Sequence, residues 1–374
     1  MRKLITVIFL FTALVVNAQT GGRPPVIVKS PEVEQGGKVT FRFLAPNAQQ
    51  VMLQRDGTTP KAMSKDSSGV WAFTETLEAD IYPYTFNVDG NNLPDPNNPA
   101  LKPIYKMALG QSMVHVPGPA SLSWEQGNVP HGAISHHFYK SAVIGSDQDL
   151  YVYTPPNYDA NRKKPYPVLY LFHGLTDEAS AWTAAGKAHV ILDNLIAQGK
   201  AEPMIMVNTL GYGVPDLLAK GFTGMTAERF KKNNELFVSS LIKEVLPMVG
   251  KNYNTGTSQK TRAVAGLSMG GGQALLAGLN NPNLFNYVGA FSPAVPVGAD
   301  FKAGFPQLNK DINNQLALLW IGIGKDDFLL SQNKQFKQLL ETNNIDFDYK
   351  ETEGAHTWMV WRRYLIEFVP LLFK

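Results

Sequence analysis

The sequence predicts an α/β fold: a small all-β sandwich over residues 24–116, followed by a domain over residues 125–374 with a mainly parallel sheet. Two observations carry this prediction. The amino-terminal region contains short runs in which apolar and polar side chains alternate, the pattern of half-buried strands. The rest of the chain alternates continuous apolar runs with helical patterns, as parallel sheets covered on both faces do. A length of 374 residues also fits two domains of ordinary size.

A signal peptide is expected at residues 1–18, ahead of the sandwich. Arg2 and Lys3 supply a positive start, residues 4–16 are apolar, and Ala18 is the small residue that cleavage requires. The apolar run is too short for a comfortable membrane span, which favours cleavage over anchoring. We therefore expect an exported protein, periplasmic or secreted, with no membrane attachment after cleavage.

Composition excludes several function classes. The chain has no Cys, which removes disulfides, thiol nucleophiles and Cys-ligated metals. The formal charge is only +3 and no strong basic cluster is present, so nucleic-acid binding has no electrostatic support. His131, His136 and His137 lie close in sequence, but acidic ligands at a familiar metal-binding spacing are missing. We expect surface strand residues there, and neither a metal nor an organic cofactor.

The sandwich is predicted from three alternating runs at residues 38–43, 50–54 and 84–88. Glycine-containing turns separate them, as in small sandwiches built from short strands. Trp71, Tyr82 and Tyr84 are aromatic residues of this region that could stack on sugar rings. Core positions are the preferred interpretation for all three.

The α/β domain is predicted from continuous apolar runs, which indicate buried parallel strands. These runs lie at residues 167–172, 204–208, 263–266, 288–291 and 316–323. Residues 235–242 and 334–340 space their apolar side chains as one face of a helix does.

Residues 266–270 read Gly-Leu-Ser-Met-Gly, which matches the G-x-S-x-G pattern of a serine-hydrolase nucleophile elbow. A strand-like run precedes the pattern and a helix-like run follows it, which is the context that the turn needs. Such a turn exposes the serine hydroxyl, and its glycines let strand and helix approach closely. Ser268 is therefore predicted to be a nucleophile.

A serine hydroxyl needs a base, and His356 is the only histidine that follows Ser268. The chain order of the α/β-hydrolase fold is Ser, then an acid, then His. Asp326 and Asp327 both follow the apolar run that ends at Gly324, where a carboxylate could orient the imidazole. The chemistry of the residues leaves both aspartates open.

The oxyanion of an ester-cleavage intermediate needs preorganised N–H donors. The backbone N–H of Met269, directly after the nucleophile, is one expected donor, and that of Leu175, after the 167–172 run, is the other. His173 lies in the same loop, where we expect a structural role. Trp182 and Trp358 are possible pocket walls because each lies near a catalytic loop, with core packing as the equal alternative.

Taken as a set, several motifs resemble carbohydrate esterase family one, the bacterial feruloyl and acetylxylan esterases, over residues 128–373. The motifs are those at residues 129–132, 152–158, 172–174, 265–271 and 354–358. The resemblance implies an acid three residues after Gly324, which selects Asp327. It also implies esters of plant cell-wall polysaccharide such as arabinoxylan as partners. Residues 24–116 resemble immunoglobulin-like early-set modules, including glycogen-binding-type carbohydrate-binding modules.

These inferences together lead us to expect a secreted serine carboxylesterase that acts on feruloylated xylan through an acyl-enzyme on Ser268. An acetylxylan esterase would use the same chemistry with a smaller acyl pocket. A peptidase or an acyltransferase of the same fold stays open. A non-catalytic polysaccharide-binding protein is the alternative from a different class, and the complete Ser, Asp and His set argues against it.

Overall fold

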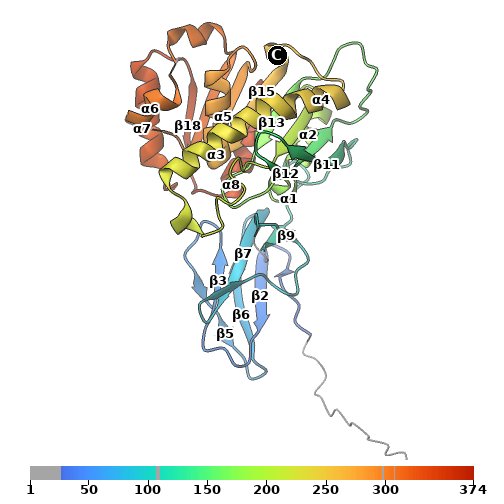
Figure 1. Ribbon diagram of the computed structural model, residues 1–374. Coiled ribbons are helices and arrows are strands. Elements are labelled where there is room, and N and C mark those ends of the chain that lie inside the picture. Colours follow the sequence, from blue (N-terminus) through green and yellow to red (C-terminus); the bar gives the residue numbers. More distant parts are fainter. Residues whose placement is uncertain (1–26, 107–109, 297–298, 307) are drawn as a thin grey trace, which may run out of the picture.

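The computed structural model describes residues 27–106, 110–296, 299–306 and 308–374. The predicted signal peptide lies outside the described residues. Figure 1 shows a small all-β part and a larger α/β part, as the sequence predicts. Among the described residues, no helix combines the length and the apolar character that crossing a bilayer requires.

The all-β part consists of two sheets whose paired strands are all antiparallel. The first sheet has the order β1-β2-β6-β5, formed by Glu32–Val33, Lys38–Leu44, Val70–Thr76 and Ser64–Lys65. The second has the order β4-β3-β7-β10-β9, formed by Lys61–Ala62, Val51–Arg55, Asp80–Val88, Gln111–Val116 and Leu101–Lys102. A short strand, β8 (Asn91–Leu93), also pairs with β7.

Aromatic side chains fill the space between these two sheets. Trp71, Tyr82 and Tyr84 are buried in one apolar cluster, and the ring centroids of Phe41 and Tyr84 lie 4.9 Å apart. The Trp71 indole N–H donates to the carbonyl of Ala45 at 2.9 Å, so its polar edge is also satisfied inside the fold. The preference for core positions over sugar-stacking positions is confirmed for all three residues.

The α/β part is built on an eight-stranded sheet with the order β11-β12-β14-β13-β15-β16-β17-β18. In that order the strands are Ala133–Ser141, Ser146–Thr154, Ile205–Thr209, Val168–Phe172, Arg262–Leu267, Tyr287–Phe291, Leu318–Gly324 and Asp348–Thr352. Strands β13 to β18 pair in parallel, whereas β11 and β12 add an antiparallel edge. Each of the five apolar runs singled out above forms one of the parallel strands.

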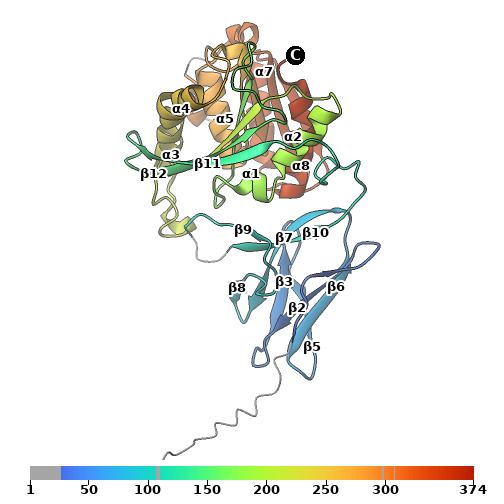
Figure 2. The ribbon, with the colours of Figure 1, turned by 90° about the vertical axis from the view of Figure 1, so that its right-hand side faces the viewer.

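Helices cover both faces of this sheet (Figure 2). They are α1 (Ala181–Ala184), α2 (Ala188–Ala197), α3 (Ala227–Ser240), α4 (Leu246–Asn252), α5 (Met269–Asn280), α6 (Ala299–Gly304), α7 (Leu330–Thr342) and α8 (Trp358–Phe368). Alternate residues of β13 point to opposite faces: Leu169 and Leu171 pack in the cluster that includes α2 and α8, and Val168 and Tyr170 in the one that includes α3, α5 and α7. Because both faces of β13 pack against helices, its side chains must be apolar along the whole strand.

The all-β part contacts the α/β part directly, because β7 lies against α8 and β9 against α1. Asp80 of β7 is ion-paired with Arg362 of α8, and Lys102 of β9 with Asp177, which follows β13. At Gly57, after β3, a Cβ atom would lie only 2.7 Å from Cγ2 of Thr357. The turn there packs against the residue that directly follows His356.

Candidate active site

Ser268 occupies a tight turn between β15 and α5, with φ 52° and ψ −116°. A positive φ is uncommon for a residue with a side chain, and such strain persists only where the surroundings hold it. Here the N–H of Ser268 donates to the carbonyl of Phe291 at 2.9 Å. Its own carbonyl accepts from Ala294 at 2.9 Å and from Gly272 at 3.1 Å. The turn is thus held by β16, by the loop after β16 and by α5.

Two glycines make this turn possible. A Cβ atom at Gly266 would lie 2.4 Å from the carbonyl oxygen of Gly270, and one at Gly270 would lie 2.4 Å from the carbonyl oxygen of His173. Contacts that short are not tolerated between a Cβ atom and backbone. The spacing of glycine around Ser268 therefore follows from the direct packing of α5 on the ends of β15 and β13.

Asp327 and His356 meet at the carboxyl ends of β17 and β18. His356 Nδ1 lies 2.8 Å from Asp327 Oδ2, and the two side chains are 15% and 0% exposed. The other carboxylate oxygen of Asp327 accepts the N–H of Leu329 at 2.8 Å. Asp326 is exposed, and its N–H donates to Gly354 at 3.0 Å. Of the two aspartates, the structure places Asp327 against the imidazole.

Two aromatic rings flank the His356 imidazole. The Phe328 ring lies 4.5 Å and the Trp361 ring 4.8 Å away between centroids. The indole N–H of Trp361 donates to Ser292 Oγ at 3.1 Å, and Ser292 directly follows Phe291, whose carbonyl binds the Ser268 N–H. The histidine loop is thus connected to the serine turn through the end of β16. Both lie at the carboxyl edge of the parallel strands.

The expected oxyanion donors come from two segments that lie together. Met269 is the first residue of α5 and is buried, and Leu175 packs against the same apolar cluster. A Cβ atom at Gly174 would lie 3.5 Å from Cβ of Ser268, so the loop of residues 174–177, here called the β13 loop, directly adjoins the serine.

His173, just before the β13 loop, uses both of its ring nitrogens. Nδ1 lies 2.7 Å from the carbonyl oxygen of Gly174, and Nε2 accepts the N–H of Gly211 at 2.8 Å. Burial lowers the pKa of the imidazole, since a charged ring would lose its hydration. These contacts agree with the expected structural role of His173.

Trp182 and Trp358 are both buried, and their rings pack edge to face with centroids 5.1 Å apart. The Trp182 N–H donates to the carbonyl of Phe172 at 2.9 Å. Both side chains thus lie in the core of the α/β part, which is the alternative to a role as pocket walls.

The residue that the sequence reasoning missed is Phe328, which is 75% exposed beside His356. Its position directly after Asp327 is the only signal that the sequence carries.

The three neighbouring histidines do not converge on one point. His131 bonds Asp193 at 3.0 Å, His136 bonds Asp149 at 2.6 Å, and His137 bonds Tyr253. In the part of the chain that the structure describes, no group of three or more His, Cys, Asp or Glu side chains could hold a metal ion.

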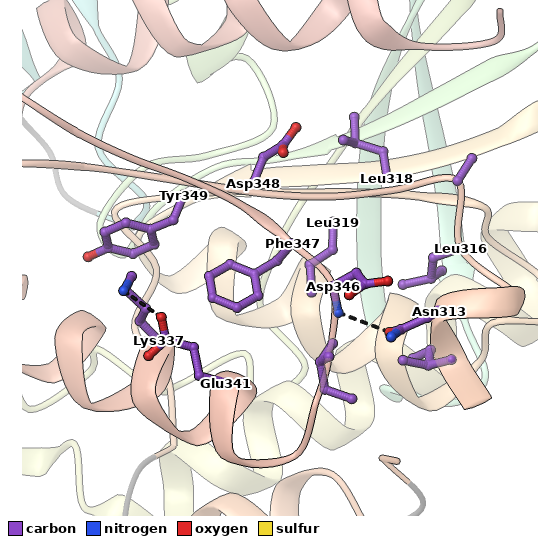
Figure 3. Close-up of a pocket in the computed structure, with 13 residues that line it drawn as sticks. Asn313, Leu316, Leu318, Leu319, Lys337, Glu341, Asp346, Phe347, Asp348 and Tyr349 are labelled. Carbon is purple, nitrogen blue, oxygen red and sulfur yellow. Dashed lines mark hydrogen bonds and ion pairs between the residues drawn. The ribbon is translucent and has the colours of Figure 1, made fainter. Parts of the chain in front are cut away.

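A hollow of about 650 Å³ lies at the amino-terminal ends of β17 and β18 (Figure 3). It is lined by residues 316–319 at the start of β17, by residues 346–349 at the start of β18, and by the Lys337–Glu341 ion pair of α7. Asp327 and His356 follow the opposite ends of those two strands. This hollow is therefore separate from the candidate active site.

An elbow serine at the carboxyl edge of a mainly parallel sheet, with a histidine–aspartate pair at the same edge, is characteristic of hydrolases with the α/β-hydrolase fold. Comparison with known families agrees. A family described as putative esterase matches residues 141–372, and the chain belongs to that family. This places the chain among the carboxylic ester hydrolases.

Individual relatives carry related descriptions. An endo-1,4-beta-xylanase/feruloyl esterase from Xylanibacter ruminicola is 31% identical over 361 residues, which are 92% of this chain and 46% of that protein. The chain thus spans about half the length of that relative. An acetyl esterase from Caldicellulosiruptor saccharolyticus is 23% identical over 53% of this chain and 79% of its own length.

Solved structures extend the similarity. A ferulic acid esterase of carbohydrate esterase family one from Anaeromyces mucronatus is 26% identical, with a TM-score of 0.59 over 68% of this chain and 96% of its own. The enterobactin esterase of Shigella flexneri is 18% identical, with a TM-score of 0.63 over 89% of this chain and 92% of its own. The latter is a likeness in fold alone.

Proposed function

We propose that this chain is a serine carboxylesterase in which Ser268 is the nucleophile, His356 the general base and Asp327 the acid that orients it. The observation that carries the proposal is the 2.8 Å hydrogen bond between His356 and Asp327 at the same sheet edge as the strained Ser268 turn. A buried carboxylate on Nδ1 fixes the tautomer and leaves Nε2 free to accept a proton.

The proposed reaction has two halves. His356 takes the proton of the Ser268 hydroxyl as its oxygen attacks the ester carbonyl, and the N–H groups of Met269 and Leu175 stabilise the resulting oxyanion. The alcohol leaves with a proton from His356. Water, deprotonated by His356, then attacks the acyl-enzyme and releases the acid, and the proton passes from His356 to the Ser268 oxygen, which restores the serine.

We infer that the acyl group is aromatic, of the feruloyl class, and that its alcohol belongs to a plant cell-wall polysaccharide such as arabinoxylan. The descriptions of the Xylanibacter and Anaeromyces relatives support this inference. The exposed ring of Phe328 beside His356 supports it further, because aromatic rings favour contact with one another. Export through a signal peptide at residues 1–18 would bring the enzyme to such a substrate.

Domain boundaries at residues 24–116 and 125–374 belong to the same proposal. The last strand of the sandwich ends at Val116, and the first strand of the catalytic sheet begins at Ala133. Both boundaries are consistent with these elements.

The test compares the full chain and its Ser268→Ala variant on methyl ferulate and on acetylated xylan. We expect hydrolysis of methyl ferulate by the wild-type protein, with a loss of about 10⁴-fold or more in the variant. Faster release of acetate than of ferulate would replace the feruloyl proposal with the acetylxylan alternative. Retained hydrolysis in a correctly folded variant would refute the nucleophile, and xylan pull-down without any hydrolysis would favour a binding protein.

A further inference from the structure

A strap from the sandwich, residues 101–105, lies against the β13 loop of the catalytic domain. The ammonium group of Lys102 pairs with the carboxylate of Asp177, and these side chains are only 4% and 6% exposed. The N–H of Tyr105 donates to the carbonyl of Thr176 at 2.8 Å. Two consecutive residues of the β13 loop are therefore held by a different domain.

The ring of Tyr105 adds a third contact. It stacks on the Tyr212 ring, with centroids 3.9 Å apart and planes within 10°, and the Tyr212 hydroxyl donates to the carbonyl of Asp177 at 3.2 Å. Tyr105 also shares a cluster with Met269 and Leu175, the proposed oxyanion donors. The strap thus packs in the same apolar cluster as the residues that carry the proposed oxyanion donors.

The β13 loop needs such support because its backbone is strained. Thr176 has φ +71°, a conformation that is a genuine outlier for a β-branched residue. Within the catalytic domain the loop is held by the bond of His173 to Gly174, by the N–H of Asp177, which donates to Gly174 at 3.3 Å, and by the bond of the Tyr212 hydroxyl to Asp177. The strap adds the hydrogen bond to the carbonyl of the strained Thr176 and the ion pair with the Asp177 carboxylate.

A second carboxylate, that of Asp56 in the sandwich, interacts electrostatically with the ion pair. Asp56 accepts a hydrogen bond from the Gln111 amide at 3.1 Å. Burial raises the pKa of Asp56, the charge of Lys102 lowers it, and the charge of Asp177 raises it again. Lys102 therefore interacts electrostatically with a carboxylate of each domain.

We propose that Lys102 and Tyr105 are positioning residues of the esterase reaction, which hold the β13 loop so that the Leu175 N–H points at the oxyanion. This inference rests on the proposed function. The sandwich would then complete the active site, and it need not bind sugar to do so. In keeping with this, each of its Phe, Tyr and Trp side chains within the described residues is buried or half-buried.

The expected effect is on the transition state rather than on substrate binding. A donor that meets the oxyanion only during reaction affects kcat and leaves KM nearly unchanged. A displacement of about 1 Å in such a group can cost about 100-fold in rate. We expect Lys102→Met to lower kcat at least ten-fold, with KM for methyl ferulate changed less than about two-fold.

The experiment uses the full chain with three variants. Lys102→Met leaves Asp177 without its partner and could unfold the interface, so Lys102→Met/Asp177→Asn removes both charges together. Lys106→Met is the control, because the exposed Lys106 also makes a cross-domain contact, to the carbonyl of Pro215 at 2.6 Å, without touching the β13 loop. A fluorophosphonate probe counts reactive serines, and each kcat is expressed per reactive serine.

A boronic acid inhibitor, whose tetrahedral adduct places an oxygen at the oxyanion site, gives the second readout. We expect its affinity to fall in parallel with kcat/KM in the folded double variant, while ferulate binding and the Lys106→Met variant keep wild-type values. Wild-type kcat in the folded double variant, or an equal loss in Lys106→Met, would overturn the inference. A wild-type protein that neither hydrolyses esters nor reacts with the probe would instead refute the proposed function.

Discussion

Asp80 in β7 and Arg362 in α8 form an ion pair closed to solvent, with side chains 1% and 0% exposed. The Arg362 guanidinium also donates to the carbonyls of Ile81 and Ala185, each at 2.6 Å. One side chain therefore binds the sandwich and the catalytic domain at once. Because a buried guanidinium requires all of these partners, the two domains should unfold together.

Arg362→Met should destabilise the protein strongly. It leaves the Asp80 carboxylate in the interface without its main partner, a loss of about 3–5 kcal/mol for a broken buried pair. Urea unfolding followed by circular dichroism and by tryptophan fluorescence measures this loss. Arg363→Met is the control: Arg363 pairs with the same carboxylate at 2.8 Å but is 46% exposed, so about 1 kcal/mol or less is expected. Equal losses in the two variants would contradict the role of Arg362.

Asp327→Asn should lower kcat by about 10³–10⁴-fold, because an amide cannot stabilise the imidazolium and favours the wrong histidine tautomer. Asp326→Asn makes the same chemical change one residue earlier, on an exposed side chain, and should cost less than about three-fold. Steady-state kinetics on methyl ferulate compares them. The opposite ranking would assign the acid to Asp326.

Phe328→Ala should raise KM for methyl ferulate by about two- to ten-fold, which corresponds to the loss of one aromatic contact, and should change KM for an acetyl ester much less. Its effect on the unfolding free energy should stay within about 0.5 kcal/mol because the ring is exposed. Phe138→Ala is the matched control, since Phe138 on β11 is 76% exposed against 75% for Phe328. If both substrates weaken equally, Phe328 does not select the acyl group.

His173 should make the protein less stable in mild acid. Burial lowers the pKa of His173 from the ordinary value of 6.5, so below about pH 6.5 the unfolded chain binds a proton that the folded protein excludes. The unfolding free energy then falls by up to about 1.4 kcal/mol per pH unit, and no such loss occurs above that pH.

His173→Gln removes this titration. Wild type should be the more stable at pH 8, because Gln replaces the two ring hydrogen bonds incompletely. The difference should shrink as the pH falls from 6.5 towards 5. Urea unfolding at pH 5, 6, 7 and 8 measures it, and a constant difference would show that His173 titrates alike in both states.

Much of the catalytic domain was predictable from local pattern. Five of the six parallel strands, β13 to β17, are covered on both faces, and therefore their apolar runs are continuous in the sequence. The turn at Ser268 is recognisable in the sequence because only glycine fits at Gly266 and Gly270. Strands β11 and β12 were not predicted. Strand β11 is an edge strand with mostly exposed residues, so nothing in its hydrophobicity distinguishes it from a loop.

The remaining features depend on contacts between distant segments. Asp326 and Asp327 follow the same strand, and only the path of the turn decides which one faces His356; the sequence alone left both open, and a family resemblance selected Asp327. The exposed ring of Phe328 and the pairs that Lys102 and Asp80 make across the interface have no local signature. Their partners lie 75 and 282 residues away along the chain.

The Asp80–Arg362 pair also determines when the interface between the two domains can close during translation. The sandwich is translated before the catalytic domain, so Asp80 and Lys102 at first have no partners across the interface. Asp177 arrives early enough to engage the strap, but α8, with Arg362, emerges only after every strand of the catalytic sheet. His356 is made just before that helix. A nascent chain would thus hold an unfinished interface until α8 is translated, and it would acquire the closed interface and the proposed catalytic base almost together.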